Sequence, residues 1–263
     1  YSLDSETNGF IARDFGTVGD IVTGGSDYTG DGQSDASVYR PSTSNFIYGT
    51  DQTAPGQNFS ANQWGASGDR AVPGDFDGDG KNDVAVWRPS TGDFYILRSS
   101  DNGFQGFHWG QQNDIPVSGD FDGDTVTDFA VVRQTSGGSV WLIQKSNYNY
   151  GFDEITQWGV PTDKLVPADY DGDGLTDLAV WRPSNGTFYV RRSSDSALQA
   201  FNWGANGDIP QPADYDGDAK TDFAVWRPSN GTWYVYNSST DTFRIQAFGQ
   251  QGDQPITAAY RIQ

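Results

Sequence analysis

Aspartates crowd together in five short loops of this 263-residue chain. The second loop, DFDGDGKND from Asp75 to Asp83, places carboxylates at its positions 1, 3, 5 and 9. Like charges packed so closely repel one another, which disfavours their ionised forms. A hard cation with several oxygen ligands removes that repulsion, and calcium suits carboxylate-rich loops of this kind. The spacing therefore predicts a calcium site in each loop, with up to five Ca2+ ions in all.

The expected ligands occupy the same five positions of every loop. Side chains at positions 1, 3, 5 and 9 and the backbone carbonyl of position 7 would converge on the ion, because a glycine at position 4 lets the backbone curl tightly. In chain order these positions hold Asp27, Thr29, Asp31, Gln33 and Asp35; Asp75, Asp77, Asp79, Lys81 and Asp83; Asp120, Asp122, Asp124, Val126 and Asp128; Asp169, Asp171, Asp173, Leu175 and Asp177; and Asp214, Asp216, Asp218, Lys220 and Asp222.

The loops differ at two positions. Threonine at position 3 of the first loop, Thr29, is a weaker calcium ligand than aspartate. Position 6 is glycine in three loops but Thr125 in the third loop and Ala219 in the fifth. If the backbone is left-handed there, a side chain costs about 1 kcal/mol or more. We therefore expect the loops that begin at Asp75 and Asp169 to bind most tightly, and the first loop most weakly.

An ordinary Asp-Gly turn between two strands is the alternative interpretation of each loop. Repetition of the same oxygen-bearing positions in every copy favours calcium instead. A helical EF-hand does not fit, because Val86 stands at position 12 of the second loop, where that motif needs glutamate. The apolar run after each loop, such as residues 223–226, predicts a strand covered on both faces. Each loop therefore joins two strands.

A repeat of four short strands runs through the chain. The loops begin 48, 45, 49 and 45 residues apart, and an aromatic-glycine pair with an aspartate five residues after the aromatic recurs six times. No stretch has helical periodicity beyond about one turn. Repeats of this length and content are typical of β-propeller blades, which bury their faces by stacking around an axis. We therefore expect an all-β chain whose aromatic residues mainly pack between blades.

The two ends of the chain predict how the propeller closes. Residues 1–10 align without a gap on residues 95–104, which places the start of the chain in a third strand. Residues 254–260 match a first strand, with Ala259 where the loop would begin. We therefore expect a six-bladed β-propeller of four-stranded antiparallel blades, its last blade closed by both termini. A five-bladed ring with surplus ends is one alternative, and pairing of the open blade with another subunit is a second.

Residues 1–263 are accordingly expected to form a single β-propeller domain. The sixth blade lacks a second strand, so we expect the chain to be a C-terminal fragment of a longer secreted protein.

The charge and composition of the chain exclude some partners. Its 16 basic residues face 35 acidic ones, giving a formal net charge of −19, and the five loops hold 19 of the acids. Such a chain is a poor partner for nucleic acid. No apolar stretch approaches the ~20 residues of a membrane-spanning helix, so we expect no membrane insertion. The chain has no cysteine, so neither disulfides nor thiol chemistry is available.

Few residues outside the loops point to chemistry. His108 is the only histidine, and its equivalents vary between repeats, which predicts a surface position. An arginine recurs once per repeat at a strand end, where we expect it to hydrogen-bond carboxylates or carbonyls. Trp141 and the segment 148–150 lack counterparts in most repeats, so they are candidates for ligand contact. The chain has no nucleophile motif on a strand-to-helix turn, and we expect that it is not an enzyme.

The order of these motifs resembles a known repeat. An aromatic-glycine pair, then a D-x-D-G-D-G-x-x-D loop, then a short apolar strand that ends in Arg-Pro is similar to the FG-GAP repeat, called the VCBS repeat in bacterial proteins. The calcium-binding blades of integrin α-subunit propellers are similar too, and the resemblance covers essentially the whole chain. It implies a propeller whose loop aspartates bind calcium on one rim, usually in secreted or surface-exposed proteins with roles in adhesion, carbohydrate binding or scaffolding.

Motifs and resemblance together predict a non-enzymatic, calcium-binding extracellular module. It would bind a glycan or protein ligand at a cell surface or matrix, as an adhesive or lectin-like protein. Two alternatives stay open: a structural subunit of a surface filament or layer that self-associates through the open blade, and an accessory domain of a larger secreted enzyme. In each case the expected location is extracellular, either secreted or on the cell surface.

Overall fold

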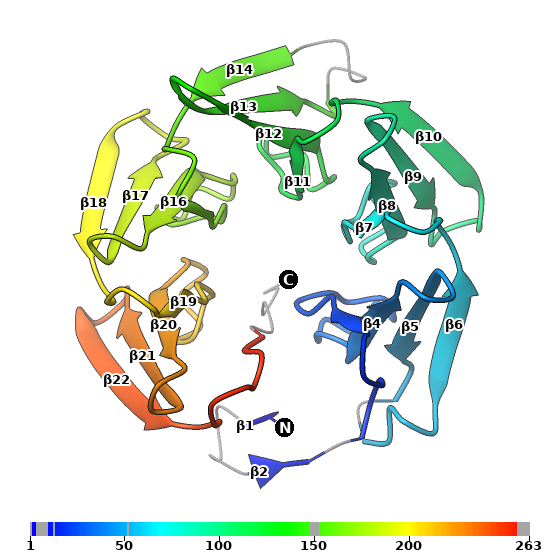
Figure 1. Cartoon of the computed structure of the whole chain (residues 1–263), viewed down its shortest axis with the longest axis horizontal. Coiled ribbons are helices and arrows are strands. Elements are labelled where there is room, and N and C mark those ends of the chain that lie inside the picture. Colours follow the sequence, from blue (N-terminus) through cyan, green and yellow to red (C-terminus); the bar gives the residue numbers. More distant parts are fainter. Residues whose placement is uncertain (1, 4–9, 13, 52, 148–152, 257–263) are drawn as a thin grey trace.

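The computed structural model describes residues 2–3, 10–12, 14–51, 53–147 and 153–256. Every regular element in these ranges is a β-strand, which confirms the all-β prediction. Five antiparallel sheets of four strands each are arranged around a common axis as the blades of a propeller (Figure 1). The described residues contain no helix long and apolar enough to cross a membrane.

Each blade is a meander whose strands pair in sequence order. Figure 1 shows the first strand of a blade nearest the axis and the fourth at the circumference. The blades comprise β3 (Ile21–Val22), β4 (Ser37–Arg40), β5 (Asn45–Gly49) and β6 (Phe59–Gln63); β7 (Arg70–Ala71), β8 (Val84–Arg88), β9 (Asp93–Leu97) and β10 (Phe104–His108); β11 (Ile115–Val117), β12 (Phe129–Thr135), β13 (Gly138–Gln144) and β14 (Asp153–Gln157); β15 (Lys164–Leu165), β16 (Leu178–Arg182), β17 (Thr187–Arg191) and β18 (Leu198–Asn202); and β19 (Ile209–Pro210), β20 (Phe223–Arg227), β21 (Thr232–Asn237) and β22 (Thr242–Ala247).

Burial of a strand follows its place in the blade. The second strand is apolar on both faces, and the first four residues of β20 are all buried. This confirms the prediction of a strand covered on both sides. The fourth strand alternates instead: in β18, Gln199 and Phe201 are half-buried, and Leu198, Ala200 and Asn202 are exposed. Such alternation marks a strand with one covered face.

The hydrophobic core lies between neighbouring blades. Phe94 of β9 packs against Phe129 of β12 in the next blade, with ring centroids 5.1 Å apart. Phe76, in the loop before β8, stacks on the same ring at 5.2 Å. The indole N–H of Trp64 donates to the carbonyl of Tyr95 in the following blade at 2.9 Å. The expectation that the aromatic residues mainly pack between blades is confirmed.

The number of complete blades corrects the prediction of six. β1 (Ser2–Leu3) and β2 (Phe10–Ile11) form only a two-stranded antiparallel sheet, which lies between β22 and the first blade in Figure 1. The predicted inner strand, residues 254–260, lies partly outside the described residues, and its described part is in no strand. Five complete blades are therefore seen in the described ranges, as in the five-bladed alternative, because no described strand pairs with the second edge of β1.

The meander sorts its connections onto two rims of the ring. Antiparallel neighbours run in opposite directions, so the connection of strands one and two and that of strands three and four meet at the same end of a blade. The acidic loops therefore share one rim, here called the acidic rim, with the turns at Ser99, Ser146, Ser193 and Ser238. The remaining connections lie on the opposite rim.

Candidate metal centres

Four of the five acidic loops bring three carboxylates to one point. In the second loop, ligand oxygens of Asp75, Asp77 and Asp83 lie within 4.8 Å of one another. Positions 1, 3 and 9 cluster likewise in the third and fourth loops, whereas positions 1, 3 and 5 cluster in the fifth. These clusters are Asp120, Asp122 and Asp128; Asp169, Asp171 and Asp177; and Asp214, Asp216 and Asp218. Oxygen sets of this kind are able to hold a divalent cation.

One oxygen in each cluster is buried without a hydrogen-bond partner. It is the Oδ1 atom of the position-3 aspartate, in Asp77, Asp122, Asp171 and Asp216. The Oδ2 atom of each of these carboxylates does accept a hydrogen bond. Leaving a buried acceptor unsatisfied costs about 1–3 kcal/mol, and more for a charged group. A cation beside these oxygens would remove that penalty, so the residues present fit a bound metal ion.

The aspartate at position 9 is the most deeply buried carboxylate of the loop. Asp83 has no exposed surface, and it accepts the backbone N–H groups of Phe76 at 2.8 Å and Ser99 at 2.7 Å. Burial raises the pKa of Asp83 to about 7, and the neighbouring loop carboxylates add to the increase. Burial raises the pKa of Asp128 to about 7 in the same way. A neighbouring cation would lower both pKa values.

The aspartate at position 1 holds the loop in its curl. Asp75 accepts the N–H of Gly78 on Oδ1 at 2.7 Å and the N–H of Gly80 on Oδ2 at 2.9 Å. Gly78, at position 4, has φ +77°, in the left-handed region that glycine adopts without strain. All five loops repeat these hydrogen bonds. The predicted role of the position-4 glycine is confirmed.

Positions 5 and 7 make contacts beyond those expected. Asp79, at position 5, accepts the N–H of Lys81 at 2.9 Å and the hydroxyl of Ser99 at 2.8 Å. The side chain of Lys81, at position 7, lies over Gly30 of the preceding loop, 2.7 Å from where a Cβ would stand. The ligand role of the position-7 carbonyl stays a prediction.

The first loop differs from the other four. The hydroxyl of Thr29 donates to Oδ1 of Asp27 at 3.4 Å. No cluster of three acidic side chains forms at this loop among the described residues. Burial raises the pKa of Asp35 to about 6. The ligand roles of the five residues predicted here stay predictions, and this loop is the weakest candidate.

Backbone hydrogen bonds join each acidic loop to the next. The N–H of position 8 in one loop donates to the carbonyl of position 1 in the preceding loop. The four bonds run from Asn82 to Asp27 at 2.6 Å, from Thr127 to Asp75 at 2.6 Å, from Thr176 to Asp120 at 2.7 Å and from Thr221 to Asp169 at 2.7 Å. The five loops therefore form a connected band along the acidic rim.

The turn between strands three and four supplies donors that the sequence analysis missed. We name it the serine turn; its residues are Ser99–Ser100, Ser146–Asn147, Ser193–Ser194 and Ser238–Ser239. The backbone N–H of its first serine donates to the position-9 aspartate at 2.6–2.7 Å, and the hydroxyl donates to position 5 at 2.7–2.9 Å. The sequence does contain a signal for this turn, because a serine follows position 9 by 16 or 18 residues in these four repeats.

The opposite rim carries an ion pair in each blade. Arg182, at the end of β16, makes two hydrogen bonds to Asp163, at 2.8 and 2.9 Å, and this carboxylate has no exposed side-chain surface. Asp163 follows an aromatic-glycine pair and also accepts the N–H of Val160. Equivalent pairs join Arg40 to Asp20, Arg88 to Asp69, Arg133 to Asp114 and Arg227 to Asp208. The predicted structural role of the recurring arginine is confirmed.

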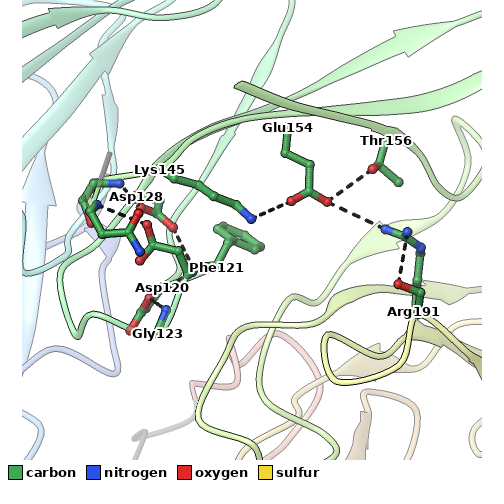
Figure 2. A network of polar contacts seen from close by, with 12 residues as sticks. Asp120, Phe121, Gly123, Asp128, Lys145, Glu154, Thr156 and Arg191 are labelled. Carbon is green, nitrogen blue, oxygen red and sulfur yellow. Dashed lines mark hydrogen bonds and ion pairs between the residues drawn. The ribbon is translucent and has the colours of Figure 1, made fainter. Parts of the chain in front are cut away.

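An ion-pair network beside the third loop links two blades (Figure 2). Nζ of Lys145 lies 2.8 Å from Oε2 of Glu154, and Oε1 of Glu154 lies 3.8 Å from the guanidinium of Arg191 in the next blade. Lys145 directly precedes the serine turn of its blade. The network therefore connects the third and fourth blades near the cluster that contains Asp120 and Asp128.

The other candidates have mixed outcomes. His108 is exposed, as predicted, and its Nδ1 lies 2.7 Å from Oδ1 of Asp93. Trp141 is fully buried and its indole N–H donates to the carbonyl of Trp158 at 3.0 Å, so its prediction as a ligand contact is wrong. The core between blades needs a large apolar side chain at that place. The segment 148–150 lies outside the described residues.

Solved structures with a similar fold share little sequence with this chain. A streptogramin B lyase aligns over 88% of this chain and 70% of its own, with 12% identity and a TM-score of 0.54. A protein described as exported, from Bacteroides fragilis, aligns over 89% and 74%, with 9% identity and a TM-score of 0.51. At this identity the likeness shows the fold alone. No curated protein sequence matches the chain.

The sequence pattern of the FG-GAP-like repeat matches the chain twice, over residues 120–180 and 169–225. These stretches contain the three acidic loops that begin at Asp120, Asp169 and Asp214, together with strands β12 to β19 and the first three residues of β20. The matched repeats thus coincide with the part of the chain that forms acidic loops and strands of the third, fourth and fifth blades. The chain carries FG-GAP-like repeats, with their acidic loops, on a β-propeller.

Proposed function

We propose that this chain is a calcium-binding propeller that acts outside the cell as a non-enzymatic binding module. FG-GAP-like repeats on a propeller indicate a binding or structural role. The proposal adds that the acidic clusters bind calcium, and that the ordered propeller presents a surface to a glycan or protein ligand.

The unpartnered Oδ1 atoms of the position-3 aspartates are the observation that supports calcium best. Each is buried, and each belongs to an aspartate that contributes one carboxylate oxygen to a cluster spanning no more than 4.8 Å. Hard oxygen donors favour calcium or magnesium over softer metals. Magnesium demands near-octahedral geometry and keeps several waters, whereas calcium accepts irregular carboxylate sets. Four bound divalent ions would change the net charge from −19 to −11.

The non-enzymatic part of the proposal follows from how the acidic groups are used. The carboxylates of the acidic rim repeat from blade to blade, which suits a set of similar metal sites. Acid–base catalysis needs instead one place where two titratable groups have unlike environments. On the opposite rim, arginines hold the carboxylates, as Arg182 holds Asp163.

Calcium titration of metal-free protein tests the metal assignment. Calorimetry should show about four bound ions, and calcium should raise the melting temperature, because a ligand that binds only the native state stabilises it. The double variant D77N/D171N should bind about two ions fewer. Asp101 is exposed and pairs with Arg98 outside the clusters, so D101N should bind as many ions as the unchanged chain. An unchanged melting temperature in excess EGTA would contradict the proposal.

Glycan arrays and immobilised matrix proteins, screened with calcium and with EGTA, test the binding role. Binding that disappears on chelation would support a calcium-dependent adhesive or lectin-like module. Absence of binding on both panels would count against it.

A structural subunit of a surface layer or filament is the second candidate, and the incomplete place in the ring favours it. β22 borders the two-stranded β1–β2 sheet in Figure 1, and its Phe243 and Ile245 are 64% and 54% exposed. Ile245 stands where the outer strands of the other blades carry Ala61, Gly106, Ile155 and Ala200, so this face has an exposed isoleucine in two of the five blades. Another copy of the chain could cover these apolar side chains. Light scattering over a range of concentrations should then show assembly that F243S/I245S abolishes, and a monomer throughout would exclude it.

A further inference from the structure

We infer that the serine turn is a positioning device for the metal site, because it takes one oxygen of the position-3 aspartate and leaves the other for the ion. The inference rests on the proposed calcium function of the acidic clusters. It assigns a role to the second residue of the turn, and in particular to Ser100, Ser194 and Ser239.

The two oxygens of the position-3 carboxylate have different surroundings in the same residue. The hydroxyls of Ser100, Ser194 and Ser239 donate to Oδ2 of the position-3 aspartates at 2.6, 2.5 and 2.6 Å. In each case the Oδ1 atom of that carboxylate is buried and unpartnered. A carboxylate coordinates calcium through one of its oxygens or through both. Because Oδ2 accepts the serine hydroxyl, Oδ1 is the oxygen left to coordinate the ion.

The first residue of the turn holds two further carboxylates. In the fourth blade, the N–H of Ser193 donates to Asp177 at 2.6 Å, and the hydroxyl of Ser193 donates to Asp173 at 2.9 Å. Together with the bond from Ser194 to Asp171, the turn contacts three of the four acidic side chains in that loop. The loop belongs to the inner pair of strands and the turn to the outer pair. The turn therefore fixes the carboxylates against a separate hairpin.

The blades that lack this arrangement provide an internal comparison. In the third blade Asn147 replaces the second serine, and only its backbone N–H reaches Asp122, at 3.2 Å. In the first blade a longer connection, residues 50–58, takes the place of the serine turn. The first loop, which receives no serine turn, is the one in which the described acidic side chains form no cluster of three. In the third blade the backbone N–H of Asn147 occupies Oδ2 of Asp122 in place of a hydroxyl, and Oδ1 is again buried and unpartnered.

Removal of three hydroxyls at once tests the inference. In S100A/S194A/S239A the three position-3 carboxylates lose their hydroxyl donor, while the third blade, with Asn147, is unchanged. Loss of an outer partner of a metal ligand typically weakens metal binding by about 10–100-fold. We expect about three ions to bind at least about 10-fold more weakly, and one ion to bind as before.

A matched control replaces three serines on the opposite rim. Ser90, Ser184 and Ser229 are exposed and stand at equivalent places after the Arg-Pro pair, so S90A/S184A/S229A should bind calcium as the unchanged chain does. The three serines under test are themselves exposed, so their removal leaves no cavity. The variant S100T/S194T/S239T restores the hydroxyls and should recover most of the affinity.

Two readouts separate positioning from a general structural role. The melting temperature in EGTA should be nearly the same for the alanine variant and the unchanged chain. Terbium bound in place of calcium reports the number of coordinated waters through its luminescence lifetime. That number should change in the alanine variant, since Oδ2 then keeps at most a long backbone hydrogen bond, at 3.3 Å from Ser100 and 3.2 Å from Ser239, and becomes available to the ion.

The outcomes distinguish the inference from the function on which it rests. If the unchanged chain binds no calcium, the proposed function fails and this inference fails with it. If the unchanged chain binds calcium and the alanine variant binds it equally well with the same terbium lifetime, only the serine role is overturned. An equal loss of melting temperature with calcium and with EGTA, at unchanged affinity, would also overturn it, by showing a structural turn.

Discussion

At the scale of single residues, the backbone at position 6 distinguishes the acidic loops. Gly32, Gly80 and Gly174 have φ of +80°, +88° and +87°, and Thr125 and Ala219 take the same left-handed conformation at +70° and +69°. This region strains residues that have a Cβ. A Cβ at Gly80 would meet no atom within 4 Å, so the strain arises from the backbone and not from packing. The structure thus confirms that Thr125 and Ala219 have the left-handed backbone in which a side chain is strained.

Glycine at position 6 should therefore stabilise the third and fifth loops. T125G and A219G are each expected to raise the free energy of unfolding by about 0.5–1 kcal/mol, since relief of the left-handed strain exceeds the added chain entropy of glycine. The reverse change, G80A, should lower it by a similar amount. Urea unfolding in saturating calcium measures all three, and a loss of stability in T125G and A219G would contradict the assignment.

The buried position-9 aspartates predict an unusual pH dependence for metal-free protein. Burial raises the pKa of Asp83 and Asp128 to about 7 from an ordinary value of 3.8. Between these values the folded chain binds more protons than the unfolded chain, so stability falls as pH rises from about 4 to about 7. The melting temperature in EGTA should thus be higher at pH 5 than at pH 8.

Calcium should remove or reverse this trend, because metal binding requires the ionised carboxylates and weakens as they gain protons. The metal-free variant D83N/D128N should show a smaller pH dependence than the unchanged chain. A metal-free protein more stable at pH 8 than at pH 5 would show that these aspartates are ionised without a metal.

At the scale of elements, the arginine at the end of the second strand fastens that strand to the connection entering the same blade. Arg182 meets Asp163 with two hydrogen bonds, and its guanidinium stacks over Tyr189 at 4.5 Å. The side chain of Arg182 is 26% exposed, while that of Asp163 is fully buried. Removal of the arginine would leave that carboxylate without its cation.

R182A should accordingly be strongly destabilising. Breaking a buried pair by removing one partner typically costs about 3–5 kcal/mol, so we expect R182A to lower the free energy of unfolding by about 3 kcal/mol, since this pair is partly exposed. Arg98 forms a pair of the same chemistry with Asp101, but this carboxylate is 56% exposed, whereas that of Asp163 is fully buried. R98A should therefore cost less than about 1 kcal/mol. Chemical denaturation compares the two, and equal losses would refute the distinction.

At the scale of the whole molecule, the acidic loops act as one band. The third loop is bonded on both sides, through Thr127 to Asp75 and through Thr176 to its own Asp120. In the fifth loop, a Cβ at Gly217 would meet nothing within 4 Å, whereas every other position-4 glycine lies under a side chain of the next loop. An ion in the third loop thus orders more of the rim than an ion in the fifth.

Loss of the same ligand should therefore have unequal effects in the two loops. D122N should lower the melting temperature in calcium by more than D216N, because disorder in the third loop loosens two neighbours. In EGTA the two variants should differ much less, since neither site then holds an ion. Equal decreases in calcium would mean that the ion sites are independent.

Much of the site could be predicted from residues close together in the chain. The curl of the loop depends on an aspartate and a glycine three residues apart, as Asp75 and Gly78 show, and the buried strand after each loop depends on a short apolar run. Local hydrogen bonds and alternation leave a direct mark on the sequence. The loops, the strands and the repeat could therefore be predicted from the sequence alone.

Contacts between distant residues were decided by the tertiary structure. Ser99 meets Asp83 across 16 residues and Arg182 meets Asp163 across 19, because the meander returns alternate connections to the same rim. The number of complete blades depends on the angle between successive sheets, summed around the ring, and no single segment encodes that sum. The sequence thus determined the repeating unit and its acidic loop, while the assembly of the units decided which carboxylates converge, which oxygen is left unpartnered, and how the ring is filled.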